Sequence, residues 1–341
     1  MILRTRVFSL GLLLALAAMT PGVLNAQDAQ PMSETSLGTA SGGTGGKLSG
    51  GSLSGGTVTG VDGGTEDFSA SASSTGPEAV TFDGTYVWIA SQFTDSVTRV
   101  RASDGSLAGT YTVGKRPVAL LYAAGSVWVA NLVGDTITKL NPSTGAIAAT
   151  YSAGDGPGGI AFDGTSLWIA NREANTVTKM STSGAKLGTF NVGHRPVGIA
   201  FAGGAIWVVN NFSNSVTKLS LAGAVLGTFA TGKGPFGVAG QGENVWVTNY
   251  FGKSVTKLRA ADGVNLGEFK VGDGASGVVF DGTYVWVVNN GDSTLMKLTP
   301  ADGSVVITYA TGKGPFAVAF DGKKVWVPNF ASNSVSSTSV N

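Results

Sequence analysis

Few residues of this chain could carry chemistry, and they are scattered along it. His194 is the only histidine and cysteine is absent, which excludes disulfides, thiolate metal sites, a cysteine nucleophile and metal sites built from several histidines. No second group is placed to orient His194 as the base of a serine triad. Five carboxylates could hold a divalent metal, but only if the fold made them converge. They are Asp135, Asp155, Glu173, Asp273 and Asp292. No catalytic residue and no resident cofactor is therefore predicted.

The elements that must position these residues come from an internal repeat. Glycine supplies 52 of 341 residues and charged residues only 13%, a composition unlike that of charge-driven disordered chains. All seven tryptophans occupy one place in a unit of 39 or 40 residues. They are Trp88, Trp128, Trp168, Trp207, Trp246, Trp286 and Trp326. A fixed period near 40 is typical of repeat architectures, in which each copy is one supersecondary unit.

Each copy contains four short segments rich in β-branched and aromatic residues, separated by Gly, Asp-Gly or Asn-Ser. In the fourth copy they predict strands at residues 196–201, 205–210, 215–219 and 225–231. The second of these strands places Ile206 and Val208 on one face and Trp207 and Val209 on the other, so both faces are buried. The sequence therefore predicts an all-β, seven-bladed β-propeller of four-stranded antiparallel blades over residues 65–341.

The two ends of the repeat predict how the ring closes. The seventh copy supplies strands at 315–320, 324–329 and 334–340 and then ends without a fourth. Residues 66–73, just before the first copy, alternate Phe68, Ala70 and Ala72 on one side. We expect this N-terminal segment to pair as the missing outer strand, because closure would protect two strand edges.

The start of the chain is typical of an exported protein. Arg4 and Arg6 precede an apolar run at residues 7–18, and a small-residue cleavage site ends at Ala26. Residues 1–26 are thus predicted to be a signal peptide, with an uncleaved anchor as the alternative. Residues 27–64 are rich in Gly, Ser and Thr and are predicted to form a flexible linker. The mature protein would be periplasmic or extracellular, without a transmembrane segment. The net charge of +1 and the lack of a basic cluster indicate no nucleic-acid partner.

The stretch at residues 168–179, with Trp168, Asn171 and Lys179 at its landmarks, resembles the YVTN-type repeat. It is similar to the propellers of the streptogramin (virginiamycin B) lyase-like group and to NHL-type sensor domains. The resemblance covers residues 77–341 and implies a propeller fold. The lyases use a catalytic histidine and a Mg²⁺ site of acidic and histidine ligands. No residue here matches that set, because His194 occupies a variable loop position where other copies have Lys or Asp.

One face of the predicted propeller varies more than turn geometry requires. It carries the loops from the fourth strand to the next first strand (D–A loops) and from the second strand to the third (B–C loops). Aromatic and basic residues gather there, as they do on binding surfaces. The alternative is that the aromatics fold inward over the blades. The predicted binding residues are Phe93, Arg116, Arg172, Arg195, Phe212, Tyr250, Phe251 and Phe330.

Three further series recur between copies. An Asp-Gly turn, as at Asp163, is expected to be structural, with a metal-binding Asp ring as the alternative. A series of Asn residues ending the second strand is expected to cap turns, with a ring of amides in the channel as the alternative. A Lys or Arg on the third strand is expected to form a solvated stripe whose stems pack on the sheet. The Asn series is Asn131, Asn171, Asn210, Asn249, Asn289 and Asn329, and the cationic series is Arg99, Lys139, Lys179, Lys218, Lys257 and Lys297.

Three function classes remain compatible with these patterns. The leading one is an exported, non-catalytic binding or scaffold propeller that engages a protein, a polysaccharide or a small ligand through its D–A/B–C loop face. The alternative is a metal-assisted lyase or hydrolase at the channel mouth, which would bring in a divalent metal. The third is a purely structural envelope protein.

Overall fold

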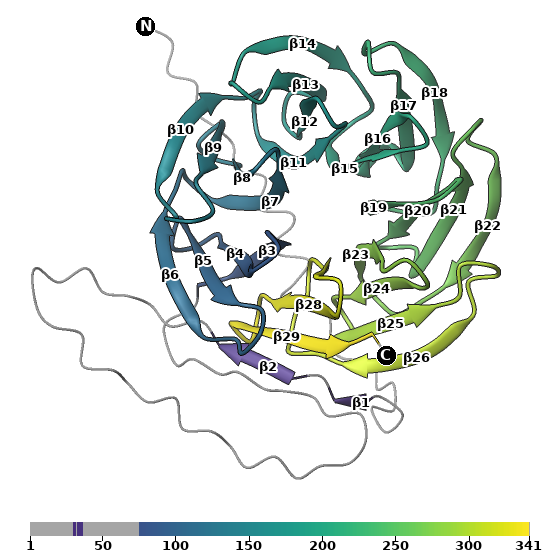
Figure 1. Cartoon of the computed structure of the whole chain (residues 1–341). Helices are drawn as coiled ribbons and strands as arrows, with labels where there is room; N and C mark the ends of the chain where they lie inside the picture. The colour runs from purple at the N-terminus through teal and green to yellow at the C-terminus, as the bar shows by residue number, and fades with distance from the viewer. Residues whose placement is uncertain (1–29, 32, 37–74, 341) are drawn as a thin grey trace, which may run out of the picture.

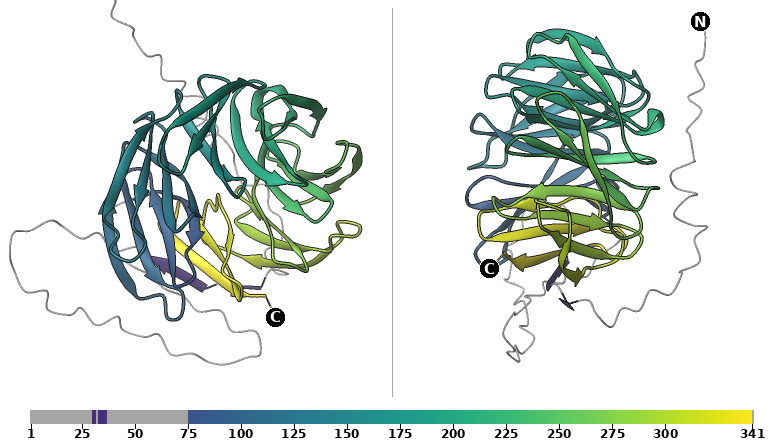
Figure 2. Two further views of the ribbon diagram at one scale, coloured as in Figure 1. Left: turned by 45° about the horizontal axis from the view of Figure 1, so that its top comes forward. Right: turned by 90° about the vertical axis from the view of Figure 1, so that its right-hand side faces the viewer.

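The computed structural model describes residues 30–31, 33–36 and 75–340. Seven sheets stand around a central axis, as the view along that axis shows (Figure 1). Their innermost strands line a channel along this axis. The edge-on view shows the disc that they form (Figure 2). The predicted seven-bladed β-propeller is therefore confirmed. The predicted signal peptide, residues 1–26, lies outside the described residues. Within the described part of the chain, no helix has the length and apolar character needed to cross a membrane.

Every blade begins at the channel and runs outward, with antiparallel pairing from one strand to the next. The innermost strands are β3 (Pro77–Phe82), β7 (Pro117–Ala123), β11 (Pro157–Phe162), β15 (Pro196–Ala202), β19 (Pro235–Gln241), β23 (Ala275–Phe280) and β27 (Ala319–Phe320). The second strands are β4 (Tyr86–Ser91), β8 (Ser126–Asn131), β12 (Ser166–Asn171), β16 (Ala205–Asn210), β20 (Asn244–Asn249), β24 (Val285–Asn289) and β28 (Lys324–Asn329).

The third strands and the outer strands complete the blades, and a short 3₁₀ turn, η2 (Asn211–Ser213), follows β16. The third strands are β5 (Ser96–Arg101), β9 (Thr136–Leu140), β13 (Thr176–Ser181), β17 (Ser215–Leu219), β21 (Ser254–Arg259), β25 (Thr294–Leu298) and β29 (Ser334–Ser339). The outer strands of the first six blades are β6 (Leu107–Thr112), β10 (Ile147–Ser152), β14 (Lys186–Asn191), β18 (Val225–Ala230), β22 (Asn265–Lys270) and β26 (Val305–Ala310).

An N-terminal strand closes the ring, but it is not the one that the sequence pattern suggested. The outer strand of the seventh blade is β2 (Ser33–Ser36), which pairs antiparallel with β29. The preceding β1 (Gln30–Pro31) pairs parallel with β26 of the sixth blade. Residues 66–73, the predicted closing segment, lie outside the described residues. A search for alternating apolar residues could not find β2, because its sequence, Ser-Glu-Thr-Ser, contains no apolar residue.

Deleting residues 27–36 should therefore lower the melting temperature, because the edge of β29 loses its partner. We expect a shift of several degrees, corresponding to about 1–2 kcal/mol. Thermal unfolding followed by circular dichroism measures it. Deletion of the equally long stretch 41–50 is the matched control. Equal melting temperatures for the two deletions would contradict a closing role for β2.

The tryptophans form the packing layer between blades. Each indole is fully buried and packs against aliphatic residues of its own blade and the next. In the first, third, sixth and seventh blades, the Asp of the Asp-Gly turn between the first and second strands accepts a hydrogen bond from this indole, for example Trp168 Nε1 to Asp163 Oδ2 at 2.8 Å. Its other oxygen accepts from the backbone N–H of Thr165 and Ser166. The structural interpretation of these Asp residues is thus supported by their contacts.

Acid should weaken this turn. Burial by itself would raise the pKa of Asp163, but hydrogen bonds from the Trp168 indole and from backbone N–H groups outweigh it and hold the pKa below its ordinary value. A carboxylate with a lowered pKa stabilises the fold above its unfolded pKa, about 3.9, and loses that contribution as the pH falls through the folded pKa. In urea unfolding, Asp163→Asn should be less stable than the parent at pH 7 by about 1 kcal/mol or less. This difference in the free energy of unfolding should become smaller below pH 3. A difference that does not change with pH would refute the stabilising role of the Asp163 carboxylate.

The cationic series on the third strands is not a solvated stripe, and that prediction was wrong. Lys218 is 8% exposed, and its Nζ donates to the carbonyls of Ala260 and Ala261 of the next blade at 2.8 Å. It also lies 5.4 Å from the Trp207 ring centroid. The same link to the next blade recurs in the first six blades, and Ser337 replaces the cation in the seventh. The neighbouring blade supplies these carbonyls, so one repeat read alone could not reveal them.

The Asn series is also internal to the blades. Its six members are fully buried, and Asn171 Nδ2 donates to the hydroxyls of Thr176 and Thr178 on β13 at 3.0 and 2.9 Å. Its Oδ1 accepts from the backbone N–H of Gly154 in the D–A loop at 3.2 Å. These amides therefore brace the loop face from below and are not presented to the channel.

Candidate functional site

The loop face is a braced surface. In every blade the first residue after the second strand donates its backbone N–H to a carbonyl of the D–A loop. For Arg172 the acceptor is Gly156 O at 2.8 Å, and for Tyr250 it is Gly234 O at 2.8 Å. This bonding confirms that the D–A and B–C loops share one face. Side chains on such loops are held by a rigid scaffold, as binding sites require.

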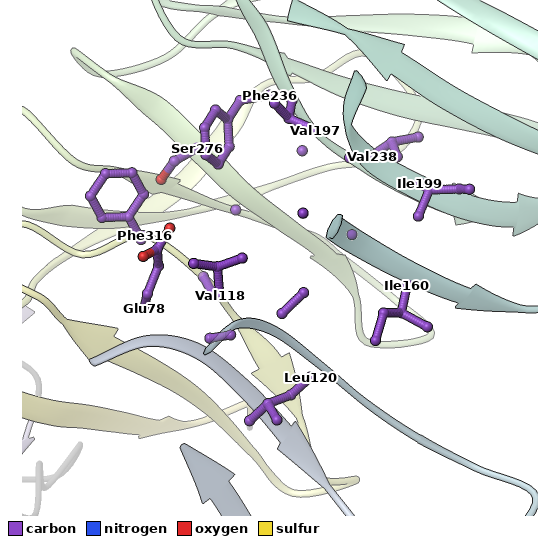
Figure 3. A pocket seen from close by; sticks show the side chains of 18 of the residues that line it. Glu78, Val118, Leu120, Ile160, Val197, Ile199, Phe236, Val238, Ser276 and Phe316 are labelled. Carbon is purple, nitrogen blue, oxygen red and sulfur yellow. The ribbon is translucent and has the colours of Figure 1, made fainter. Parts of the chain in front are cut away.

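The channel opens on this face and is lined by two rings of side chains from the innermost strands (Figure 3). The mouth ring consists of the second residue of each innermost segment. Its members are Glu78, Val118, Gly158, Val197, Phe236, Ser276 and Phe316. The deep ring, two residues further on, is entirely aliphatic: Val80, Leu120, Ile160, Ile199, Val238, Val278 and Val318. Together they enclose about 210 Å³ of water-accessible space.

The residues between the two rings are all Ala or Gly, since neighbouring innermost strands approach closely around the channel. A Cβ added at Gly159 would lie 2.7 Å from the carbonyl oxygen of Val197, and one at Gly277 would lie 3.0 Å from that of Phe316. The scaffold therefore fixes the diameter of the channel. Of the two rings, only the mouth ring varies in chemical type from blade to blade.

Arg172 enters this channel from the B–C loop of the third blade. Its side chain crosses Gly158, where an added Cβ would overlap its Cδ and Cγ. The residue is 9% exposed, and its Nε is buried without a hydrogen-bond partner. Burial lowers the pKa of Arg172 to about 10, and the neighbouring Arg195 and Arg116 add to this effect, while Glu78 and Glu173 oppose it. A buried donor without a hydrogen-bond partner costs free energy, and an acceptor that reached Nε would remove this cost.

Glu78 is the only acidic residue of the mouth ring. Its Oε2 is excluded from solvent and has no hydrogen-bond partner. Burial raises the pKa of this carboxyl, while Arg172 and Arg116 act to lower it. The two groups are thus close enough to influence each other, yet no ion pair joins Glu78 to Arg172 among the described residues.

Aromatic side chains occupy the other side of the mouth. Six of them form a continuous aromatic arc over blades five, seven and one, with successive ring centroids 5.2–6.1 Å apart. In order they are Phe251, Tyr250, Phe236, Phe316, Phe330 and Phe93. Phe93 and Phe251 are 53% and 50% exposed, so they do not fold inward over the blades. An exposed aromatic arc next to a channel is suited to an apolar ligand group.

Arg116, Arg172 and Arg195 form an arginine arc over blades two to four. Arg116 Nε donates to Gln92 Oε1 at 2.7 Å. Arg195 lies 4.6 Å from the ring centroid of Phe212, which is 63% exposed and outside the aromatic arc. Burial and the nearby Arg116 lower the pKa of Arg195, and Glu173 opposes them. The structure thus brings seven of the eight predicted residues into two arcs around one mouth and leaves Phe212 at its rim.

The carboxylates that a metal-assisted reaction would need do not converge. Asp273 pairs with Lys253 at 2.9 Å, and Asp292 accepts the backbone N–H of Asp273 at 2.6 Å. Asp135 accepts the backbone N–H of Gly156 at 2.9 Å, so it braces the loops. Across residues 30–31, 33–36 and 75–340, no group of three or more potential ligands is placed to hold a metal ion. The arrangement that a metal-assisted lyase requires is therefore not found there.

Sequence reasoning missed Glu78, Gly158 and Ser276 as parts of the mouth. A signal was present, because these residues follow the start of the innermost strand, where the other copies carry Val or Phe. The pattern predicted which strand is innermost, so the first inward position could have been compared between copies. The path of Arg172 over Gly158 had no such signal, since it depends on a side-chain direction.

The architecture defines the chain as a seven-bladed β-propeller with an open, polarised channel mouth. No family model and no curated protein matches the chain. Among solved structures it is similar to a streptogramin B lyase, with a TM-score of 0.70 and 17% identity over 80% of this chain and 96% of that one. The hydrazine synthase of Kuenenia stuttgartiensis gives a TM-score of 0.72, with 19% identity over 84% of this chain and 99% of that one. BamB from Moraxella catarrhalis gives a TM-score of 0.58, with 16% identity over 78% of this chain and 85% of that one. These likenesses show the fold alone.

Proposed function

We propose that this chain is an exported, non-catalytic binding propeller whose channel mouth takes a small amphipathic anion. The observation that carries the proposal is the Arg172 guanidinium, 9% exposed, turned into the channel and unpartnered at Nε. Arg116 and Arg195 are near enough to act on its surroundings electrostatically. An anion at this position would relieve the repulsion among the three guanidiniums and satisfy the buried donor.

The apolar part of the ligand would occupy the channel or lie on the aromatic arc. The deep ring offers only aliphatic side chains. The water-accessible space of about 210 Å³ is smaller than the ~300–1,000 Å³ clefts that hold drug-sized molecules, which favours a small group over a polymer inside the channel. Export rests on the signal-peptide pattern of residues 1–26.

The test uses a matched pair of probes, 4-methylpentanoate and its neutral amide, titrated calorimetrically into the full chain. We expect the carboxylate to bind at least about tenfold more tightly than the amide, because a charge-assisted hydrogen bond to a buried Arg is worth about 1.5–3 kcal/mol. Arg172→Gln should remove this preference, while Arg101→Gln, on the exposed end of β5, should keep it. Equal affinities of the unaltered protein for the two probes would refute the proposal.

A further inference from the structure

We propose that the mouth is selective for an apolar α-amino acid: Arg172 takes the carboxylate, Glu78 takes the ammonium group, and the aliphatic deep ring takes the side chain. This inference rests on the proposed function and narrows it from any amphipathic anion to a zwitterion. It follows from three features of the mouth: the positions of Glu78 and Arg172, the residues around Glu78, and the aliphatic side chains of the deep ring.

The opposite charges stand on different blades with an aliphatic residue between them. Glu78 belongs to the first blade, and Arg172 lies over Gly158 of the third blade. Val118 of the second blade stands between Glu78 and Gly158 in the mouth ring. Oε2 of Glu78 and Nε of Arg172 are both buried without hydrogen-bond partners. A carboxylate alone would satisfy Arg172 and leave a second acidic group unpartnered beside it. A ligand that carries a cationic donor next to its carboxylate would satisfy both.

The surroundings of Glu78 suit an ammonium group. Glu78 and Phe316 lie on the same side of the cavity, with Ser276 beyond (Figure 3). Phe316 belongs to the aromatic arc, in contact with Phe236 and Phe330 at centroid distances of 5.9 Å. Aromatic faces beside a carboxylate stabilise an ammonium ion through its charge. Arg172 itself lies over Gly158, away from these rings in the blade order.

The deep ring determines the kind of side chain. All seven of its members are Val, Leu or Ile, and none carries a hydrogen-bonding side chain. A polar amino-acid side chain would lose its hydration there without compensation. A branched aliphatic group such as that of leucine would be buried against aliphatic neighbours.

The experiment compares three probes that differ by one group each: L-leucine, 4-methylpentanoate, which lacks the amine, and L-leucinamide, which lacks the carboxylate charge. We expect L-leucine to bind the full chain at least about tenfold more tightly than either analogue. Glu78→Gln should bring L-leucine down to the affinity of 4-methylpentanoate. Arg172→Gln should bring it down to that of L-leucinamide. The control Glu243→Gln, in the exposed loop on the opposite face, should change nothing, and circular dichroism spectra should report whether each variant is folded.

The outcomes separate this inference from the proposed function. If 4-methylpentanoate binds as tightly as L-leucine, and Glu78→Gln alters neither, the zwitterion inference is overturned while anion binding stands. If L-leucinamide binds as tightly as L-leucine and Arg172→Gln does not change the affinity for L-leucine, both the zwitterion inference and the proposed anion binding are overturned. A Glu78→Gln protein that fails to fold would be replaced by Phe316→Leu, which keeps the carboxylate but removes the aromatic face. It should weaken L-leucine by a larger factor than 4-methylpentanoate, because only L-leucine carries the ammonium group; equal effects on both probes would count against the ammonium position.

Discussion

Replacing Gly158 by valine should abolish the carboxylate preference of the channel mouth without touching a charged residue. A Cβ at this position overlaps Cδ and Cγ of Arg172, so the guanidinium must leave the channel. Valine suits the strand itself, because Val118 and Val197 occupy the equivalent place in the adjacent blades. We expect 4-methylpentanoate to lose at least about tenfold in affinity, and the free energy of unfolding to fall by about 1–3 kcal/mol from overpacking. Calorimetric titration and urea unfolding measure the two effects.

A double-mutant cycle shows whether the effect passes through Arg172. In an Arg172→Ala background the space over Gly158 is free, so Gly158→Val should cost little stability and no further affinity. Additive losses in the double variant would mean that valine acts on the backbone of β11 instead. Unaltered binding by Gly158→Val alone would remove the main structural argument for Arg172 as the anion-binding residue.

Trp168→Ala should be the most destabilising single change in the third blade. The indole is fully buried and packs in one cluster with Ile199, Ile206 and Val208 of the fourth blade. It also lies 5.1 Å from Lys179 Nζ, measured to the ring centroid. Truncation leaves a cavity between blades and an unpaired acceptor on the turn, so we expect a loss of about 3–5 kcal/mol in the free energy of unfolding.

Urea unfolding at neutral pH measures this loss. Leu187→Ala is the matched control in the same blade, since Leu187 is 54% exposed on β14, and it should change stability by no more than about 0.5 kcal/mol. A Trp168→Ala protein within about 1 kcal/mol of the parent would show that the tryptophan layers do not hold the ring together.

Agreement between sequence and structure is closest where a feature recurs in every copy. The strands of the fourth copy at 205–210 and 215–219 match β16 and β17, because alternation and turn residues act within a few positions of the chain. The partner of Lys218 lies 42 residues further along, at Ala260, and no local pattern predicts such a partner. The prediction of the closing strand also failed, because β2 lies outside the repeated copies. Pairing of β2 with β29 joins the two ends of the chain, where the repeat supplies no register.

The number of blades, the direction of each strand and the two faces of the disc all follow from the repeat in the sequence. Equivalent residues of a closed repeat are forced into equivalent places, so which loops share a face follows from topology. Which side chains enter the channel, in contrast, depends on contacts that exist only in the folded ring. Gly158 leaves room that Arg172 fills from a neighbouring loop, and the narrow ring of innermost strands buries Glu78 Oε2 without a partner. Both outcomes depend on contacts around the axis, where residues far apart in the sequence come together and small differences between the seven copies lie side by side.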